Sequence, residues 1–156
     1  MPEAAGRVFP ASCSCGAARL TLTALPRHRF FCHCTVCQTV YRAPFADVTV
    51  IRADRVAIET PEAIAFARYK SPPAIERGIC TNCGKPVVAL ADMPLSPRLA
   101  FIAAKNFDDA AALPPSSMHI HYGTRSADID DTLPKRSGPL VSQLAAMRPI
   151  LGAIFS

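Results

Sequence analysis

Hydrophobic and polar positions alternate along this chain in short runs, a pattern typical of β-strands. β-Branched residues are frequent in these runs, and proline or glycine separates many of them. We expect strands in residues 18–25, 29–31, 45–52, 55–60, 63–70, 74–79, 86–91, 98–104 and 118–122. Short strands at a spacing of about ten residues predict an all-β domain.

Helical periodicity is limited to two places. A single helical turn is expected at residues 108–113, and one longer helix at 140–147. Pro139 suits the first turn of this helix, and Ser137 lies where an N-terminal cap would lie. We expect Pro149 to interrupt it, because proline lacks a backbone donor. The fold class is therefore mainly β with a short helical C-terminal tail. We expect the apolar end of this tail to pack over an open sheet edge or against a partner subunit in a homo-oligomer.

Length and composition fit one turn-rich domain. The 156 residues are enough for one hydrophobic core and too few for two domains. The 15 prolines favour turns over long helices. The net charge of +5 comes from scattered basic residues, so nucleic-acid binding is not expected. The first ten residues have no apolar core and no run approaches the ~18 apolar residues of a membrane span, so we expect a cytoplasmic location and no membrane contact.

The seven cysteines fall into three clusters, which is unlike core filler. In a reducing compartment, clustered cysteines are typical of metal sites. Two clusters are pairs closed by a glycine: Cys13 and Cys15 before Gly16, and Cys80 and Cys83 before Gly84. Glycine allows the positive φ with which a chain turns tightly around a metal. We therefore expect the two pairs to form one four-thiolate structural zinc site, which ties the N-terminal strand to a hairpin near residue 80.

The middle cluster, Cys32, Cys34 and Cys37, lacks such a glycine and is one ligand short of a tetrahedron. Three protein ligands and one open position are characteristic of catalytic zinc. The alternatives are half of another metal site, or a set of thiols without metal. Radical-type iron–sulfur clusters also use three cysteines, but at a different spacing.

Several motifs occur in a fixed order and carry a family resemblance. They are Cys13-Ser14-Cys15-Gly16, Cys32-His33-Cys34-Thr35-Val36-Cys37-Gln38, Ala43-Pro44-Phe45, Glu76-Arg77-Gly78-Ile79-Cys80-Thr81-Asn82-Cys83-Gly84, His119-Ile120 and Asp130-Asp131-Thr132-Leu133-Pro134. Between about residues 10 and 137 the chain resembles the glutathione-dependent formaldehyde-activating enzyme family, which also contains centromere protein V.

This resemblance implies a β-tent of antiparallel sheets, related to the Mss4-like fold. It implies a lead-in at residues 1–9, a zinc domain at 10–137 and a helical extension at 138–156. It also implies two zinc ions per chain: a structural one on Cys13, Cys15, Cys80 and Cys83, and a catalytic, more labile one on Cys32, Cys34 and Cys37. The implied reaction joins glutathione and formaldehyde into S-hydroxymethylglutathione, which is formally a carbon–sulfur lyase step.

Other residues are candidates for the same chemistry. Arg42, Lys70 and Arg77 could bind the carboxylates of glutathione, or be solvated surface residues. His33 could act as an acid or base, although a strand would point it away from its neighbours toward a supporting or surface role. Tyr41 could donate a proton to an alkoxide, or pack in the core. His119 and His121 are expected to share one polar strand face.

The chain departs from the family pattern at two places. Many members have glycine where Arg42 stands, and many have an aromatic residue where Ser126-Ala127-Asp128 stands. Two alternatives are therefore kept. One is an enzyme that acts on another thiol or carbonyl compound. The other is a non-enzymatic zinc module that binds a protein or nucleic acid.

Overall fold

The computed structural model of the chain describes residues 6–69 and 75–156. Its elements are β1 (Phe9–Ser12), β2 (Arg19–Leu22), β3 (His28–Cys32), α1 (Thr35–Tyr41), β4 (Ala46–Arg52), β5 (Val56–Ile58), β6 (Ile64–Ala67), β7 (Ile75–Cys80), β8 (Pro86–Ala91), β9 (Leu99–Ala103), β10 (His119–Ile120) and α2 (Pro139–Ile154). Short 3₁₀ turns lie at Ala53–Arg55, Pro61–Ala63, Ala104–Asn106, Ala110–Ala112 and Tyr122–Thr124.

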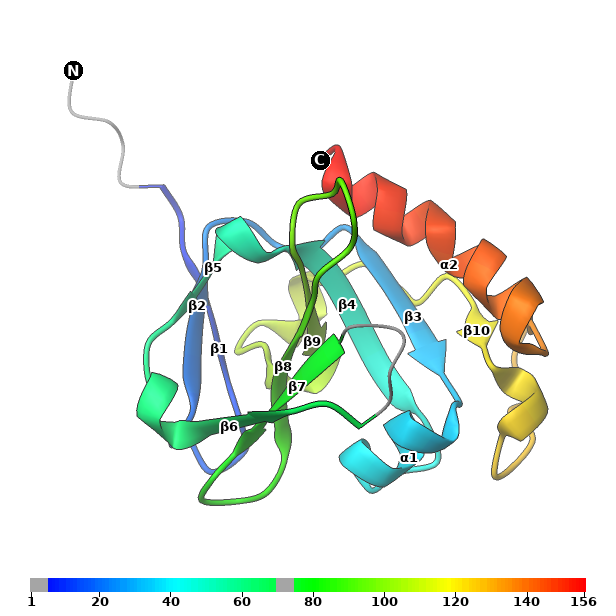
Figure 1. The fold of residues 1–156 in the computed structure, drawn as a ribbon, viewed down its shortest axis with the longest axis horizontal. Helices are drawn as coiled ribbons and strands as arrows, with labels where there is room; N and C mark the ends of the chain where they lie inside the picture. The colour runs from blue at the N-terminus through cyan, green and yellow to red at the C-terminus, as the bar shows by residue number, and fades with distance from the viewer. Residues whose placement is uncertain (1–5, 70–74) are drawn as a thin grey trace.

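The strands form two sheets (Figure 1). The small sheet has the order β1-β2-β5, and the large sheet has the order β10-β3-β4-β9-β8-β7-β6. Neighbouring strands are antiparallel except β10 and β3, which are parallel. The predicted fold class, mainly β with a short C-terminal helix, is confirmed. Among the described residues, no helix has both the length and the apolar character that crossing a bilayer requires.

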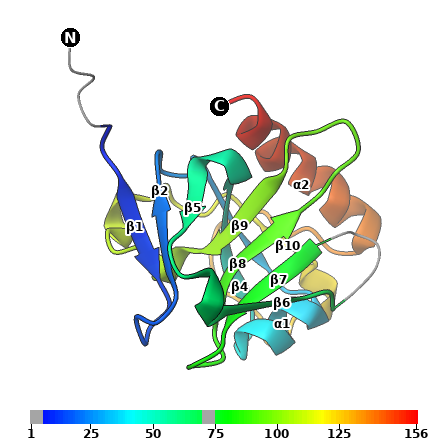
Figure 2. The ribbon, with the colours of Figure 1, turned by 60° about the vertical axis from the view of Figure 1, so that its left-hand side comes forward.

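Two hydrophobic clusters hold these layers together. The first joins the small sheet to the large one through residues such as Leu20, Leu22 and Ile102. The second lies between the large sheet and α2, where Phe30 and Val50 pack with Ile150. Cys32 and Cys37 belong to this second cluster. In Figure 2 the small sheet and α2 lie at opposite sides of the large sheet.

Helix α2 is longer than predicted and contains Pro149 without a break. Proline in a helix costs about 3 kcal/mol. The buried face of α2, which includes Ala146, Pro149 and Ile150, offsets this cost by packing on the sheet. Ser137 is not the cap; Gly138 occupies that position without a side-chain hydrogen bond.

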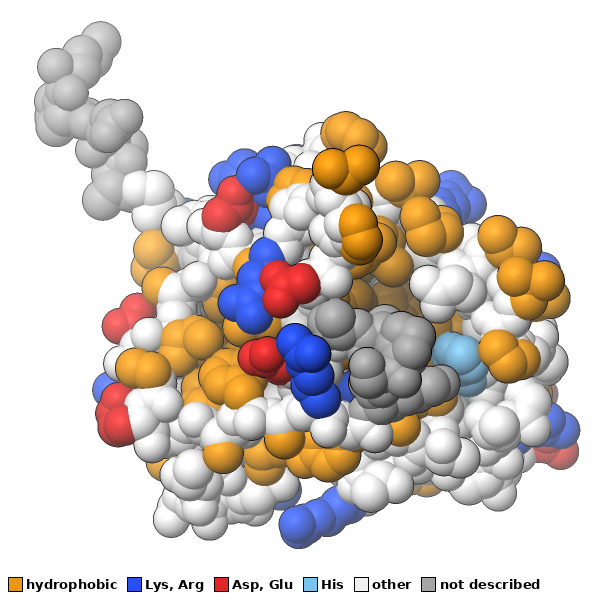
Figure 3. Space-filling model, viewed as in Figure 1, with side chains coloured by type: hydrophobic (Ala, Val, Ile, Leu, Met, Phe, Trp, Pro, Cys, Tyr) orange, Lys and Arg blue, Asp and Glu red, His pale blue; other side chains and the backbone are white. Residues whose placement is uncertain are grey.

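The outer face of α2 exposes Leu140, Leu144 and Leu151, and Phe155 just after the helix is exposed as well. Figure 3 shows hydrophobic side chains along this edge of the molecule. The inner face contacts β4, β3 and β10, so the helix covers the end of the sheet at which β10 is the edge strand. The predicted homo-oligomer contact through this tail stays a prediction.

Two further local expectations were wrong or incomplete. The expected strand at residues 118–122 is only two residues long, because His121 adopts a left-handed backbone conformation (φ 52°). Helix α1 was not predicted. It forms because Cys34 caps it: the Cys34 sulfur accepts the backbone N–H of Cys37 at 3.3 Å. The turn expected at Ser71-Pro72-Pro73 lies outside the described residues.

Candidate metal centres

Four cysteines from two distant segments lie close together. Cys13 and Cys15 follow β1, and Cys80 and Cys83 lie at the tip of the β7–β8 hairpin. The sulfur atoms of Cys13, Cys15, Cys80 and Cys83 all lie within 4.8 Å of one another. The Cys13–Cys15 and Cys15–Cys80 sulfur distances are 3.3 and 3.7 Å. A tetrahedral zinc site with ~2.3 Å bonds has sulfur–sulfur edges of about 3.8 Å. The four thiols therefore fit one zinc ion.

Two glycines shape this four-cysteine group. Gly16 and Gly84 have φ values of 77° and 72°. The backbone N–H of Gly16 donates to the Cys13 carbonyl at 3.0 Å, and that of Gly84 to the Cys80 carbonyl at 2.9 Å. Each pair thus sits in a tight turn that only glycine closes readily. The Asn82 side chain, and then the Ala17 backbone, hydrogen-bond to Cys15 and lower its pKa to about 6, which favours the ligating thiolate.

The remaining three cysteines form a second group at the junction of β3 and α1. Cys32 ends β3, Cys34 caps α1 and Cys37 lies in its first turn. Their sulfur atoms also lie within 4.8 Å of one another. Cys32 and Cys37 are buried, whereas Cys34 is half-buried. Hydrogen bonds from the Cys32 and Cys37 thiols hold the pKa of Cys34 well below its ordinary value. Without metal, the neighbouring thiols and burial raise the pKa of Cys32 and Cys37, so these two would become thiolates on binding a zinc ion.

His33 and Tyr41 both lie close to this three-cysteine group. His33 is fully buried, so a surface role is ruled out. Burial, and then the charges of His119 and Arg125, lower the pKa of His33 to about 4, which keeps its ring neutral at pH 7. Burial, and then the Cys37 charge, raise the pKa of Tyr41, so its hydroxyl keeps its proton. Tyr41 can donate a hydrogen bond but not serve as a base at neutral pH.

The structure describes two of the three expected cationic residues, Arg42 and Arg77. Arg77 lies on β7, near enough to Tyr41 for its charge to oppose the rise in the pKa of that residue. Arg42 is exposed, and its guanidinium lies against Gly84, beside the four-cysteine group. Lys70 lies outside the described residues.

Sequence reasoning missed the polar groups that surround His33. His119 and His121 were expected to share a polar strand face, but His121 lies beyond β10. His119 is fully buried and hydrogen-bonds to the His33 ring. The other nitrogen of the His119 ring hydrogen-bonds to the Asp131 carboxylate. The carbonyl of His33 accepts the side chains of Gln38 and Thr124. The motifs of His119 and Asp131 were visible in the sequence, but no periodicity relates them to His33.

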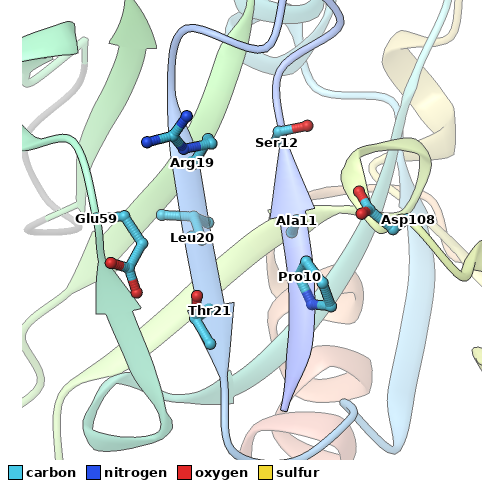
Figure 4. A pocket seen from close by; sticks show the side chains of 8 residues that line it. All are labelled: Pro10, Ala11, Ser12, Arg19, Leu20, Thr21, Glu59 and Asp108. Carbon is cyan, nitrogen blue, oxygen red and sulfur yellow. The ribbon is translucent and has the colours of Figure 1, made fainter.

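A shallow hollow of about 140 Å³ lies elsewhere, along β1 and β2 (Figure 4). Its lining residues are Pro10, Ala11, Ser12, Arg19, Leu20, Thr21, Glu59 and Asp108. It has no cysteine, and the figure shows Glu59 and Asp108 at its two sides. The seven cysteines can bind metal, whereas the hollow offers no cluster of metal ligands or nucleophiles. The candidate functional site therefore lies at the cysteines.

The fold and the two thiol groups define a mainly β, cysteine-rich domain with residues suited to zinc. Within that class, the family model described as "Glutathione-dependent formaldehyde-activating enzyme" matches residues 8–124, more than half of the chain. The chain belongs to this family.

Two further comparisons bear on the fold and on relatives. A crystal structure of a Rhodobacter sphaeroides protein from structural genomics is similar, with a TM-score of 0.50 and 16% sequence identity. The match covers 64% of this chain and 88% of that one, and it supports the fold alone. A search of curated protein sequences finds no match.

Proposed function

We propose that this protein is a zinc-dependent enzyme that joins glutathione and formaldehyde into S-hydroxymethylglutathione. Membership of the family supports glutathione-dependent formaldehyde activation in general. The observation that carries the finer proposal is the contrast between the two thiol groups. One has four sulfurs, which complete a tetrahedron, and the other has three, which leave one position for a substrate atom.

The reaction balances without an oxidant or a reductant. The glutathione sulfur attacks the formaldehyde carbon, so a carbon–sulfur bond forms as the carbonyl π bond breaks. The thiol proton ends on the oxygen, which gives the hydroxymethyl group. The reverse direction is a carbon–sulfur lyase step. Zinc, when bound, would favour the thiolate form of a sulfur ligand or polarise a carbonyl oxygen.

The residues of the chain have separate tasks in this proposal. Cys32, Cys34 and Cys37 hold the ion, and with three thiolates the site carries a net charge of about −1. Tyr41, which keeps its proton, donates a hydrogen bond to the developing alkoxide oxygen. Arg77 supplies positive charge near this region for a glutathione carboxylate.

The alternatives are a zinc module without activity and an enzyme for another thiol or carbonyl compound. Cys34 is partly exposed and belongs to a metal site with three protein ligands. Binding of a partner does not require such an open position, whereas catalysis by zinc does. Arg42, which replaces a glycine common in the family, gives little support to a changed substrate. Its guanidinium lies against Gly84, at the four-cysteine group.

The test is the rate of adduct formation from ¹³C-formaldehyde and glutathione, followed by NMR above the uncatalysed rate. The native protein should accelerate the reaction, and Cys34→Ser should be reduced to the background. Thr35→Ser is the matched control, because Thr35 is the exposed neighbour of Cys34 and offers no sulfur. Full activity in Cys34→Ser would rule out the site. No acceleration by fully zinc-loaded native protein would favour the two alternatives.

A further inference from the structure

Two histidines that are far apart in the sequence form a buried pair next to the three-cysteine group. His33, between the ligands Cys32 and Cys34, and His119, on β10, both have 0% exposure. The His33 Nε2 and His119 Nδ1 atoms are 2.8 Å apart. The pair forms because β10 lies parallel to β3, with His119 opposite Phe31 and Ile120 opposite Cys32.

A third group, Asp131, completes the row. The His119 Nε2 atom is 2.7 Å from Oδ2 of Asp131, whose Oδ1 accepts the Lys135 ammonium at 2.7 Å. Asp131 is held near His119 because the residues that follow it, 134–136, lie beside β10. The His119 N–H donates to the Pro134 carbonyl at 2.8 Å, and the Arg136 N–H to the His119 carbonyl at 2.9 Å.

Hydrogen-bond chemistry then assigns the ring protons. A carboxylate only accepts, so His119 donates from Nε2. With Nε2 as its donor, the His119 ring offers Nδ1 as an acceptor, so His33 donates from Nε2. This leaves His33 Nδ1 as a bare acceptor, and it is a buried side-chain nitrogen with no partner among the described residues. The opposite tautomer would leave a buried N–H donor without an acceptor, which costs more.

The backbone of His33 is held as firmly as its ring. Its N–H donates to the Ile120 carbonyl at 3.0 Å. Its carbonyl accepts Gln38 Nε2 at 2.7 Å and Thr124 Oγ1 at 2.9 Å. Since His33 is the single residue between Cys32 and Cys34, a change in its backbone angles would move these two cysteines relative to one another.

We propose that Asp131 and His119 are positioning residues of the three-cysteine site. Through two hydrogen bonds they fix the ring and the tautomer of His33, and thereby the spacing of the Cys32 and Cys34 sulfurs. Outer groups that orient a metal site typically alter metal affinity or activity by about 10–100-fold when removed. The proposal rests on the metal-binding part of the proposed function, and not on the identity of the substrate.

The first test uses the native protein with ¹⁵N-labelled histidine. In long-range ¹H–¹⁵N NMR spectra, His33 should show a protonated Nε2 and an unprotonated Nδ1. A protonated Nδ1 in the native protein would overturn the proposal without any variant.

The second test compares Asp131→Ala with Asp130→Ala, which changes the exposed neighbouring carboxylate. In Asp131→Ala, the His33 tautomers should mix, and zinc affinity at the three-cysteine site should fall about 10-fold or more. The four-cysteine site should keep its zinc, and Asp130→Ala should behave as the native protein. Unchanged tautomer and zinc affinity in folded Asp131→Ala would refute the proposal.

These readouts do not require activity, so a native protein that fails to make the glutathione adduct would refute only the proposed reaction.

Discussion

The guanidinium of Arg42 lies against the backbone of Gly84, with Nη2 3.3 Å from the position that a Cβ atom on Gly84 would take. Arg42 ends α1, the helix that carries Cys37, and Gly84 closes the turn that carries Cys80 and Cys83. Arg42 is in the left-handed conformation (φ 49°, ψ 46°). A residue without a Cβ atom would meet this backbone requirement at the lowest cost, and the Arg42 side chain extends from the end of α1 to the turn at Gly84.

Two substitutions at this position separate the backbone effect from the side-chain effect. Arg42→Asn and Arg42→Val both lose the guanidinium, but asparagine tolerates the left-handed conformation and β-branched valine does not. We expect the valine variant to be less stable than the asparagine variant by about 1–2 kcal/mol in the free energy of unfolding. Denaturant titration of the zinc-loaded proteins measures the difference. Equal stabilities would show that the backbone conformation at Arg42 is not what the structure describes.

Gly78 is required by close packing rather than by its φ angle. A Cβ atom there would lie 2.7 Å from the Ile64 side chain, 2.8 Å from Phe66 and 2.9 Å from the Val88 carbonyl oxygen. Because one of these is a backbone atom at the β7–β8 bulge, the strands must separate. Gly78→Ala should lower the free energy of unfolding by about 1–3 kcal/mol. Gly123→Ala is the control, because its Cβ would meet only ordinary contacts, from 3.6 Å outward. Similar losses in both variants would contradict this packing.

His28 makes the docking of α2 sensitive to pH. Its ring lies over Gly152 of α2, and burial, followed by the charges of Arg148 and Arg27, lowers its pKa. The folded protein therefore resists protonation more than the unfolded chain does. Above the ordinary histidine pKa of about 6.5, neutral His28 makes its whole contribution to the free energy of unfolding. As the pH falls from about 6.5 toward the lower pKa of the folded state, this contribution is lost.

The measurement is the change in unfolding free energy between about pH 7.5 and 5.5 in the native protein and in His28→Gln. We expect the native protein to lose more stability on acidification, because glutamine does not titrate. Protonation of the thiols affects both proteins and cancels in the comparison. A loss in His28→Gln as large as in the native protein would exclude His28 as the sensitive group.

Many of the strands were predicted because their signals are local, although β1 (Phe9–Ser12) was not. Alternating and β-branched runs mark strands such as 46–52 and 86–91, and both form where expected. The division of the cysteines followed from the glycines after Cys15 and Cys83, since a positive φ is a local requirement that a residue type reveals. The structure brings together the same four and the same three sulfurs.

The predictions that failed concern features that depend on contacts between distant parts of the chain or on a single capping group. Pro149 stays inside α2 because contacts with the sheet outweigh a local cost, and such contacts are not encoded near the residue. Helix α1 contains Thr35, Val36, Thr39 and Val40, which are poor helix formers, so it depends on its sulfur cap. The His33–His119 pair depends on a parallel strand pairing between segments 86 residues apart. Single-sequence patterns do not specify such pairings.

The four-cysteine group predicts a large effect on folding. It joins the segment after β1 to the β7–β8 hairpin and so closes the long stretch of chain between Cys15 and Cys80. Cys83→Ser should unfold or aggregate, as should the native protein after exhaustive chelation. Circular dichroism and size-exclusion chromatography give the readout. A soluble Cys83→Ser protein with native stability would mean that this group is not a structural metal site.

The most direct measurement of the central claim is the zinc content per chain, determined on native protein and on Cys34→Ser after equal zinc loading and removal of excess metal. The account predicts two zinc ions in the native protein and one in a folded Cys34→Ser, because only the three-cysteine site loses a ligand. Two tightly held ions in Cys34→Ser, or a single ion in the native protein, would contradict it.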